Sequence, residues 1–198
     1  MAFEPRAFWG SNHYGHPPLT DEMLAEAERT LGVSLPREFV DLLRVQNGGY
    51  TKGLAFPMDR PTTWAADHLP LDDLAGIVTD PNHTTAQNIL QTAYMTKEWG
   101  LPPRQVLLSG DGHYWITLDY RRGASPTVAW IDLERGEDIQ IAPSFAEFLA
   151  GLVPSDTYDV AQQDEMRRPI PVAAVPTMAC ERVGLSEPHA KEIDDEQA

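Results

Sequence analysis

Residues 19–49 read LTDEMLAEAERTLGVSLPREFVDLLRVQNGG, and this stretch decides the fold because helix start and stop signals follow one another in it at short spacing. Thr20 suits an N-cap, since its hydroxyl can accept from a backbone N–H of the first helical turn, and Asp21 suits the positive end of the helix dipole. Gly32 suits the left-handed residue that ends a helix. We therefore expect a short amphipathic helix that begins at Asp21 and stops at Gly32.

A second helix is expected directly after the first. Pro36 suits the first helical position because its φ is fixed and an N–H there would have no helical partner. Apolar residues then recur at helical spacing at Phe39, Leu42 and Leu43 before the Asn-Gly-Gly of residues 47–49. Two one-sided helices must pack on an apolar surface, and the Asn-Gly-Gly segment is expected to form the turn that leaves them.

The second half of the chain predicts a sheet whose strands follow one another. The expected strands are residues 106–108, 114–120, 127–132 and 139–141, which are joined by short turns. Pro143 then opens a helix whose apolar stripe includes Phe145 and Phe148. Because this helix and the helix pair lie outside the run of strands, we expect an α+β fold, with an antiparallel meander flanked by the N-terminal helix pair and the C-terminal helix.

The middle of the chain gives weaker patterns. Residues 54–56 and 71–78 suit short strands, a turn or a helical turn. A further helix is expected from residue 86 to residue 97, with Thr84 and Thr85 as cap candidates and Gly100 at its end.

Several motifs of this chain resemble the SUKH superfamily, which includes yeast cell-wall-synthesis regulators and bacterial toxin-immunity proteins. The first half has LG-x-x-LP-x-x-F followed by L-x-x-x-NGG, and the second half has SGDGHYWITLDYR, VAWIDLE and IAPSFAEFLAGL in the same order as that superfamily. The resemblance covers residues 19–153. It implies a SUKH-like fold and a binding domain without enzymatic activity, which in bacteria commonly neutralises a cognate polymorphic toxin by plugging its active site.

The resemblance points to the Asn-Gly-Gly turn and to residues 110–120 as a partner-binding surface, and exposed aromatic side chains beside carboxylates would suit a cationic partner. The candidate residues are Asn47, Gly48, Gly49, Tyr50, Asp111, His113, Trp115 and Asp119. For each of them a structural role is the alternative. The glycines could serve only the helix exit, Asp119 could only hydrogen-bond a neighbouring loop, and Trp115 could belong to the core, as we expect for Tyr120 and Trp130.

Charge favours a basic partner. The 198 residues include 15 basic and 30 acidic side chains, so the formal net charge is −15. Such a protein repels nucleic acid and anionic lipid at long range and attracts cations. If the cognate toxin acts on nucleic acid, carboxylates of this chain could occupy the sites that otherwise hold phosphates.

No targeting signal or membrane-spanning stretch is visible, so we expect a cytoplasmic protein. Residues 1–18 are expected to form an arm that packs Phe8 and Trp9 onto the domain. Residues 154–198 are expected to form a proline-rich, acidic extension with a mobile end. Cys180 is the single cysteine, which excludes an intrachain disulfide.

Neither a cofactor nor a metal site is expected, and the sequence has no Walker loop, GxSxG, HExxH or dinucleotide fingerprint. His13 and His16 have the spacing HxxH, but the neighbouring glycine and prolines disfavour the helix that would bring them together. Two alternatives to an immunity protein stay open. One is an intracellular regulatory scaffold, and the other is a hydrolase that uses carboxylates of residues 111–134, namely Asp111, Asp119, Asp132 and Glu134.

Overall fold

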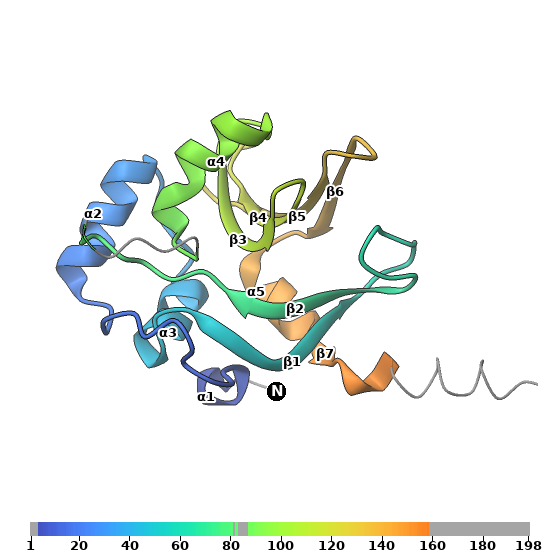
Figure 1. The fold of residues 1–198 in the computed structure, drawn as a ribbon, viewed down its shortest axis with the longest axis horizontal. Coiled ribbons are helices and arrows are strands. Elements are labelled where there is room, and N and C mark those ends of the chain that lie inside the picture. Colours follow the sequence, from blue (N-terminus) through green and yellow to red (C-terminus); the bar gives the residue numbers. More distant parts are fainter. Residues whose placement is uncertain (1–3, 81, 83–86, 159–198) are drawn as a thin grey trace, which may run out of the picture.

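The computed structural model describes residues 4–80, 82 and 87–158. Its helices are α1 (Pro5–Phe8), α2 (Asp21–Leu31), α3 (Arg37–Val45), the 3₁₀ turn η1 (Ile89–Gln91), α4 (Thr92–Trp99) and α5 (Phe145–Gly151). Its strands are β1 (Gly49–Pro57), β2 (His68–Leu74), β3 (Gln105–Asp111), β4 (Tyr114–Asp119), β5 (Thr127–Asp132), β6 (Glu137–Ala142) and β7 (Val153–Pro154). The fold is therefore α+β, as expected (Figure 1).

The helix pair begins and ends where the sequence predicts. The Thr20 hydroxyl accepts from the Met23 backbone N–H at 3.2 Å, and Gly32 ends α2 in the left-handed conformation with a φ of 68°. Pro36 lies one position before α3 and serves as its N-cap residue rather than as its first helical residue. Phe39 is fully buried, so α3 turns its apolar face to the core.

The strands form two antiparallel sheets. The four-stranded sheet has the order β3-β4-β5-β6, which is the expected meander. The three-stranded sheet has the order β2-β1-β7, in which β1 and β2 form a long hairpin. The sequence did not predict this second sheet as a unit, because the glycines and Lys52 of β1 obscure its alternation and the register of β1 against β2 shifts between Tyr50 and Leu54. Figure 1 shows the β1–β2 hairpin across the lower half of the view and the meander above it.

Helix α5 connects the two sheets. Its Ser144 cap accepts from the backbone N–H of Glu147, and its apolar face carries Phe145 and Phe148. Phe145 packs edge-on against Phe39 of α3 with ring centroids 5.5 Å apart, and Phe148 stacks on Phe56 of β1 at 5.1 Å. The same helix contacts β5 and β6, so the main core lies between the sheets around α5.

The segment before α2 is built into this core. Phe8 and Trp9 are 1% and 5% exposed, and the Trp9 indole N–H donates to Leu42 O of α3 at 3.0 Å. Gly10 donates its backbone N–H to Tyr50 O at 2.8 Å, which fixes the segment along β1. A Cβ at Gly10 would lie 2.4 Å from Thr51 O, so only glycine allows this approach.

The chain beyond α5 stays attached to the first sheet as far as it is described. β7 pairs with Leu54 and Ala55 of β1, Ser155 donates its backbone N–H to Gly53 O at 3.0 Å, and the Tyr158 ring stacks on His68 at 3.9 Å. The expectations for Cys180 and the rest of residues 159–198 lie outside the described residues.

The middle helix is shorter than expected. It consists of η1 followed by α4, and it ends at Gly100, whose φ is 70°. The cap candidates Thr84 and Thr85 lie outside the described residues, and Asn88 caps η1 instead by accepting from Leu90 N–H at 3.1 Å. Among the described helices, none has the length and the apolar character that crossing a membrane requires.

Candidate functional site

Asn47 is buried and all of its side-chain atoms are engaged. Its amide nitrogen donates to Pro17 O at 2.8 Å and to Ile77 O at 2.7 Å, and its amide oxygen accepts from Ile77 N–H at 2.8 Å. His16 Nδ1 lies 2.8 Å from the Asn47 carbonyl oxygen. Asn47 therefore joins the N-terminal segment, the exit of α3 and the segment after β2.

Gly48 and Gly49 are buried beside Asn47, with φ values of 85° and 133°. A Cβ at Gly48 would lie 2.6 Å from the backbone nitrogen of Gly76, so the turn needs glycine there for its close approach as well as for its φ. Asn47 and these two glycines were expected at a partner-binding surface. Their burial makes them residues that position the surface instead of forming it.

Tyr50 follows this turn and is exposed to 40%. Its ring lies beside His13 and Tyr14, with ring centroids 5.4 and 5.6 Å away. The Tyr14 ring in turn stacks on His16 at 5.6 Å. The N-terminal segment therefore holds an aromatic cluster in place, and Tyr50 and His13 are its exposed members.

A groove of about 370 Å³ opens where β2 meets β3, and we call it the acidic groove. The two sheets touch there, because Ala75 donates its backbone N–H to Leu108 O at 2.7 Å. The residues that line the acidic groove are Tyr50, Trp64, Pro70, Asp72, Asp73, Gln87, Ser109, Gly110 and Asp111. The groove thus brings together Tyr50 and Asp111, two of the residues singled out from the sequence, although they come from different sheets.

Asp73 organises one side of the acidic groove. Its Oδ2 accepts from the Tyr14 hydroxyl at 2.7 Å, and its Oδ1 accepts from the Ser109 hydroxyl at 2.8 Å. Burial and the bond to Asp73 raise the pKa of Tyr14, so its hydroxyl stays protonated and keeps donating. Asp73 therefore links the N-terminal segment, β2 and β3 through two hydrogen bonds.

Asp72 and Asp111 are the other charged residues of the acidic groove, and both are exposed. Neither carboxylate has a hydrogen bond or an ion pair with another residue in the part of the chain that the structure describes. Trp64 is half-buried and packs edge-on against the buried Trp130, with ring centroids 4.4 Å apart. Every charged side chain that lines the groove among the described residues is therefore a carboxylate, and two of these carboxylates lie open to a ligand beside aromatic rings.

His113 lies just beyond the groove on the β3–β4 turn. Its side chain is 43% exposed, and its Nδ1 lies 3.2 Å from Glu134 Oε1. Its ring packs edge-on against Trp99 of α4 at 4.8 Å, and Trp99 is itself 40% exposed. His113 and Trp99 therefore form a second group of exposed aromatic rings, close to Asp111.

Trp115 is only 6% exposed and does not reach this surface. It packs in a small cluster with Leu101, Leu107 and Ile131, and its indole N–H donates to Gly112 O at 2.8 Å. α4 and the segment after it cover this outer face of the meander, which the alternation within β4 could not reveal. Trp115 is therefore a core residue of this cluster.

Asp119 lies at the other end of β4 from the turn that follows Asp111. Five residue steps along β4 separate Tyr114 from Asp119, which is roughly 17 Å at the usual strand rise. Asp119 is 6% exposed and accepts from Arg121 at 2.6 Å and from Gln105 at 3.0 Å. Asp119 therefore stands apart from the candidate residues that lie at the acidic groove.

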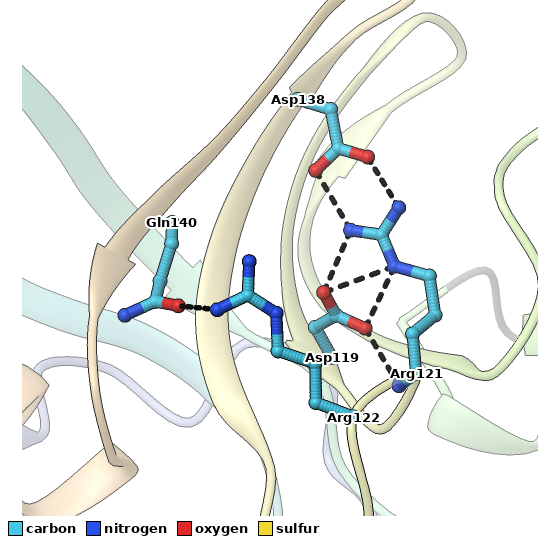
Figure 2. Close-up of a pocket in the computed structure, with 5 residues that line it drawn as sticks. All are labelled: Asp119, Arg121, Arg122, Asp138 and Gln140. Carbon is cyan, nitrogen blue, oxygen red and sulfur yellow. Dashed lines mark hydrogen bonds and ion pairs between the residues drawn. The ribbon is translucent and has the colours of Figure 1, made fainter.

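Figure 2 shows the hydrogen bonds and ion pairs around Asp119. The Arg121 guanidinium lies between Asp119 and Asp138, and its Nη2 donates to Asp138 Oδ1 at 2.8 Å. Burial raises the pKa of Asp119, but the hydrogen bonds and the charge of Arg121 outweigh it and hold the pKa below the ordinary value. Arg122 donates to Gln140 at 3.1 Å. Acid and base are balanced here, so Asp119 stabilises the meander and the loop after it.

The four carboxylates of the hydrolase alternative do not converge on one site, because Asp119 lies at the other end of β4 from Asp111, Asp132 and Glu134. Asp132 is fully buried, where it accepts from the Thr63 hydroxyl and from Arg135 N–H. Glu134 accepts from the Tyr114 hydroxyl, a bond that raises the pKa of Tyr114 to about 12. Over residues 4–80, 82 and 87–158, no group of three or more His, Cys, Asp or Glu residues is arranged to hold a metal ion.

Sequence reasoning did not single out several residues of the acidic groove and its support. These are Tyr14, Trp64, Asp72, Asp73 and Ser109. One signal was available, because the Asp72-Asp73 pair interrupts an otherwise apolar strand between Leu71 and Leu74. The other residues come from loops and strands whose meeting at the groove depends on the way the two sheets pack.

A comparison with curated proteins found no matching sequence. A comparison with protein-family models found a match to the SMI1 / KNR4 family (SUKH-1) over residues 18–151. The match spans more than half of the 198 residues and runs from the start of α2 to the end of α5. The chain therefore belongs to the SMI1 / KNR4 family, SUKH-1.

Proposed function

We propose that this protein is an immunity protein that binds and neutralises a basic, cognate toxin domain through the face that contains the acidic groove. The single observation that carries the proposal is the lining of that groove. Among the described residues its charged side chains are Asp72, Asp73 and Asp111, with no basic side chain between them. Membership of SUKH-1 supports the proposal, since the superfamily resemblance implies toxin-immunity proteins.

The chemistry of this face suits binding and not bond cleavage. The groove's hydrogen bonds are structural, because both oxygens of Asp73 accept from Tyr14 and Ser109. The remaining carboxylates, Asp72 and Asp111, can accept charge-assisted hydrogen bonds from lysine or arginine side chains of a partner. Covering a toxin's basic substrate-binding surface in this way would block access of its substrate without any reaction.

The whole-chain charge supports the same function. A net charge of −15 attracts a basic domain over distances longer than a contact and raises the rate of encounter. It also disfavours nucleic acid as a direct ligand. An immunity protein must meet its toxin inside the cell that it protects, so we place its action in the cytoplasm.

The test is co-expression with the toxin domain encoded by a neighbouring gene. The wild-type chain should restore growth and co-purify with that domain, and the variant Asp72→Lys/Asp111→Lys should lose both properties while it still folds. The matched control is Glu26→Lys/Glu38→Lys, which changes the net charge equally on the exposed faces of α2 and α3. If the wild-type chain fails to restore growth, the immunity function is contradicted. A phenotype of gene deletion in a strain that lacks any toxin would favour the regulatory scaffold instead.

A further inference from the structure

We propose that the acidic groove is a receptor for one arginine side chain of the protein partner, with the guanidinium group held between aromatic faces and two carboxylates. This inference rests on the proposed function only in taking the partner to be a protein. The residues that would contact the guanidinium are Tyr50, Trp64, Asp72 and Asp111.

The aromatic rings of the groove are held in place before any ligand arrives. Tyr50 is braced by the rings of His13 and Tyr14, and Trp64 is braced by the buried Trp130. Rings that are already fixed lose little conformational freedom on binding, which favours affinity. Planar aromatic faces attract cations and stack well with the flat guanidinium group.

The carboxylates of the groove divide into one that supports it and two that are available. Asp73 is occupied by Tyr14 and Ser109, so it holds the two sheets and the N-terminal segment together. Asp72 comes from β2 and Asp111 from β3, so the available carboxylates approach the groove from different sheets. A guanidinium presents its donors in a planar fork and can serve two carboxylates at once, whereas an ammonium acts as a point charge.

The size of the groove favours a single side chain. Ligand pockets commonly have volumes of roughly 300–1,000 Å³, and about 370 Å³ lies at the small end of that range. The groove is therefore suited to a side chain with its flanking backbone, and the rest of a protein partner would rest on the surrounding surface. Next to the groove, His113 and Trp99 provide exposed rings for such flanking contacts.

The test uses the full chain and short blocked peptides, Gly-Arg-Gly, Gly-Lys-Gly and Gly-Gln-Gly, as probes. NMR titration should show shifts of the Trp64 indole N–H and the Gly110 amide with the arginine peptide, at about tenfold lower concentration than with the lysine peptide. The glutamine peptide should shift neither signal. Equal shifts with all three peptides, or arginine-dependent shifts confined to other residues, would overturn the proposal.

Variants separate charge from stacking. Asp72→Asn/Asp111→Asn should weaken binding of the arginine peptide by about tenfold, and the matched Glu26→Gln/Glu38→Gln should leave it unchanged. Trp64→Phe should keep the arginine preference, whereas Trp64→Ala should remove it. Amide spectra that match the wild type away from the groove would show that each variant folds. If the folded Asp72→Asn/Asp111→Asn variant still binds the arginine peptide as the wild type does, the proposal is contradicted.

The outcome for this inference is distinct from that for the proposed function. If the arginine peptide fails to bind the groove while the chain still neutralises a toxin domain, the arginine receptor is wrong and the immunity function stands. If the peptide binds at the groove and no toxin is neutralised, the receptor stands and the immunity function is wrong.

Discussion

Asn47 stabilises the junction from which Tyr50 emerges. We expect Asn47→Ala to lower the free energy of unfolding by about 2 to 4 kcal/mol, because it leaves the buried carbonyl and N–H of Ile77 without their partner and removes the bond to the Pro17 carbonyl. Urea denaturation followed by circular dichroism measures the change. The control is Asn12→Ala, which removes one exposed hydrogen bond to Gly15 N–H. Equal losses for the two variants would show that Asn47 does not act as this junction.

Asp119 gives the protein a pH-dependent contribution to stability. Its pKa is lower in the folded chain than the ordinary 3.8, so the unfolded chain takes up a proton more readily than the folded one. The contribution is therefore complete above the ordinary pKa and is lost as the pH falls through the folded value. We expect the difference in unfolding free energy between wild type and Asp119→Asn to shrink between about pH 6 and about pH 3. A difference that is the same at both pH values would contradict this.

At the scale of single residues, the sequence predicted positions better than roles. The Asn-Gly-Gly spacing identified Asn47 as special, but its contact with Ile77 depends on a segment that is 30 residues away in the chain. Trp115 looked like a surface residue as readily as a core residue. The sequence predicted a helix near α4, but it did not predict which face of β4 that helix covers. Only Tyr50, Asp111 and His113 among the eight candidates combine exposure with a place at or beside the groove.

At the scale of elements, the N-terminal segment is part of the fold, although it lies outside the family match over residues 18–151. We expect Trp9→Ala to lower the free energy of unfolding by about 3 to 5 kcal/mol, because it empties a buried site and removes the bond to Leu42 O. Thermal and urea denaturation measure the loss. If Trp9→Ala unfolds like the wild type, the packing of Trp9 contributes little to the stability of the fold, contrary to the arm packed through Phe8 and Trp9 that the sequence predicts.

Helices were easier to predict than strands for a physical reason. The cap at Thr20 and the stop at Gly32 are local signals, and local hydrogen bonds form at both, whereas the last helix is capped by Ser144 and begins two residues after the predicted Pro143. The meander was also predictable, because its strands follow one another through short turns. The three-stranded sheet was not predictable from the sequence. The glycines and Lys52 obscure the alternation of β1, and β7 comes from the far end of the domain and pairs with only two residues of β1, Leu54 and Ala55.

At the scale of the whole molecule, the acidic groove could not be predicted because it forms only where the two sheets meet. Asp72 and Asp111 come from strands of different sheets, and the N-terminal segment supplies Tyr14, which donates to the neighbouring Asp73. The excess of acidic residues predicts a basic partner, and two carboxylates of the groove, Asp72 and Asp111, have no hydrogen bond or ion pair with another described residue.

The net charge makes association sensitive to salt. We expect the association rate constant with the basic toxin domain to fall as ionic strength rises from about 0.05 M to about 0.5 M, because exposed charges are screened beyond the Debye length. Stopped-flow fluorescence measures the rate. Asp72→Asn/Asp111→Asn should reduce the slope of this dependence, and a rate that does not change with salt would show that charge does not steer the encounter.

The most direct measurement of the central claim is the dissociation constant of the toxin domain, determined by calorimetry for three forms of the chain. We expect Asp72→Asn/Asp111→Asn to bind at least about tenfold more weakly than the wild type, and Glu26→Gln/Glu38→Gln to bind as the wild type does. Equal dissociation constants for the wild type and the folded groove variant would contradict the claim that this protein grips its partner through the acidic groove.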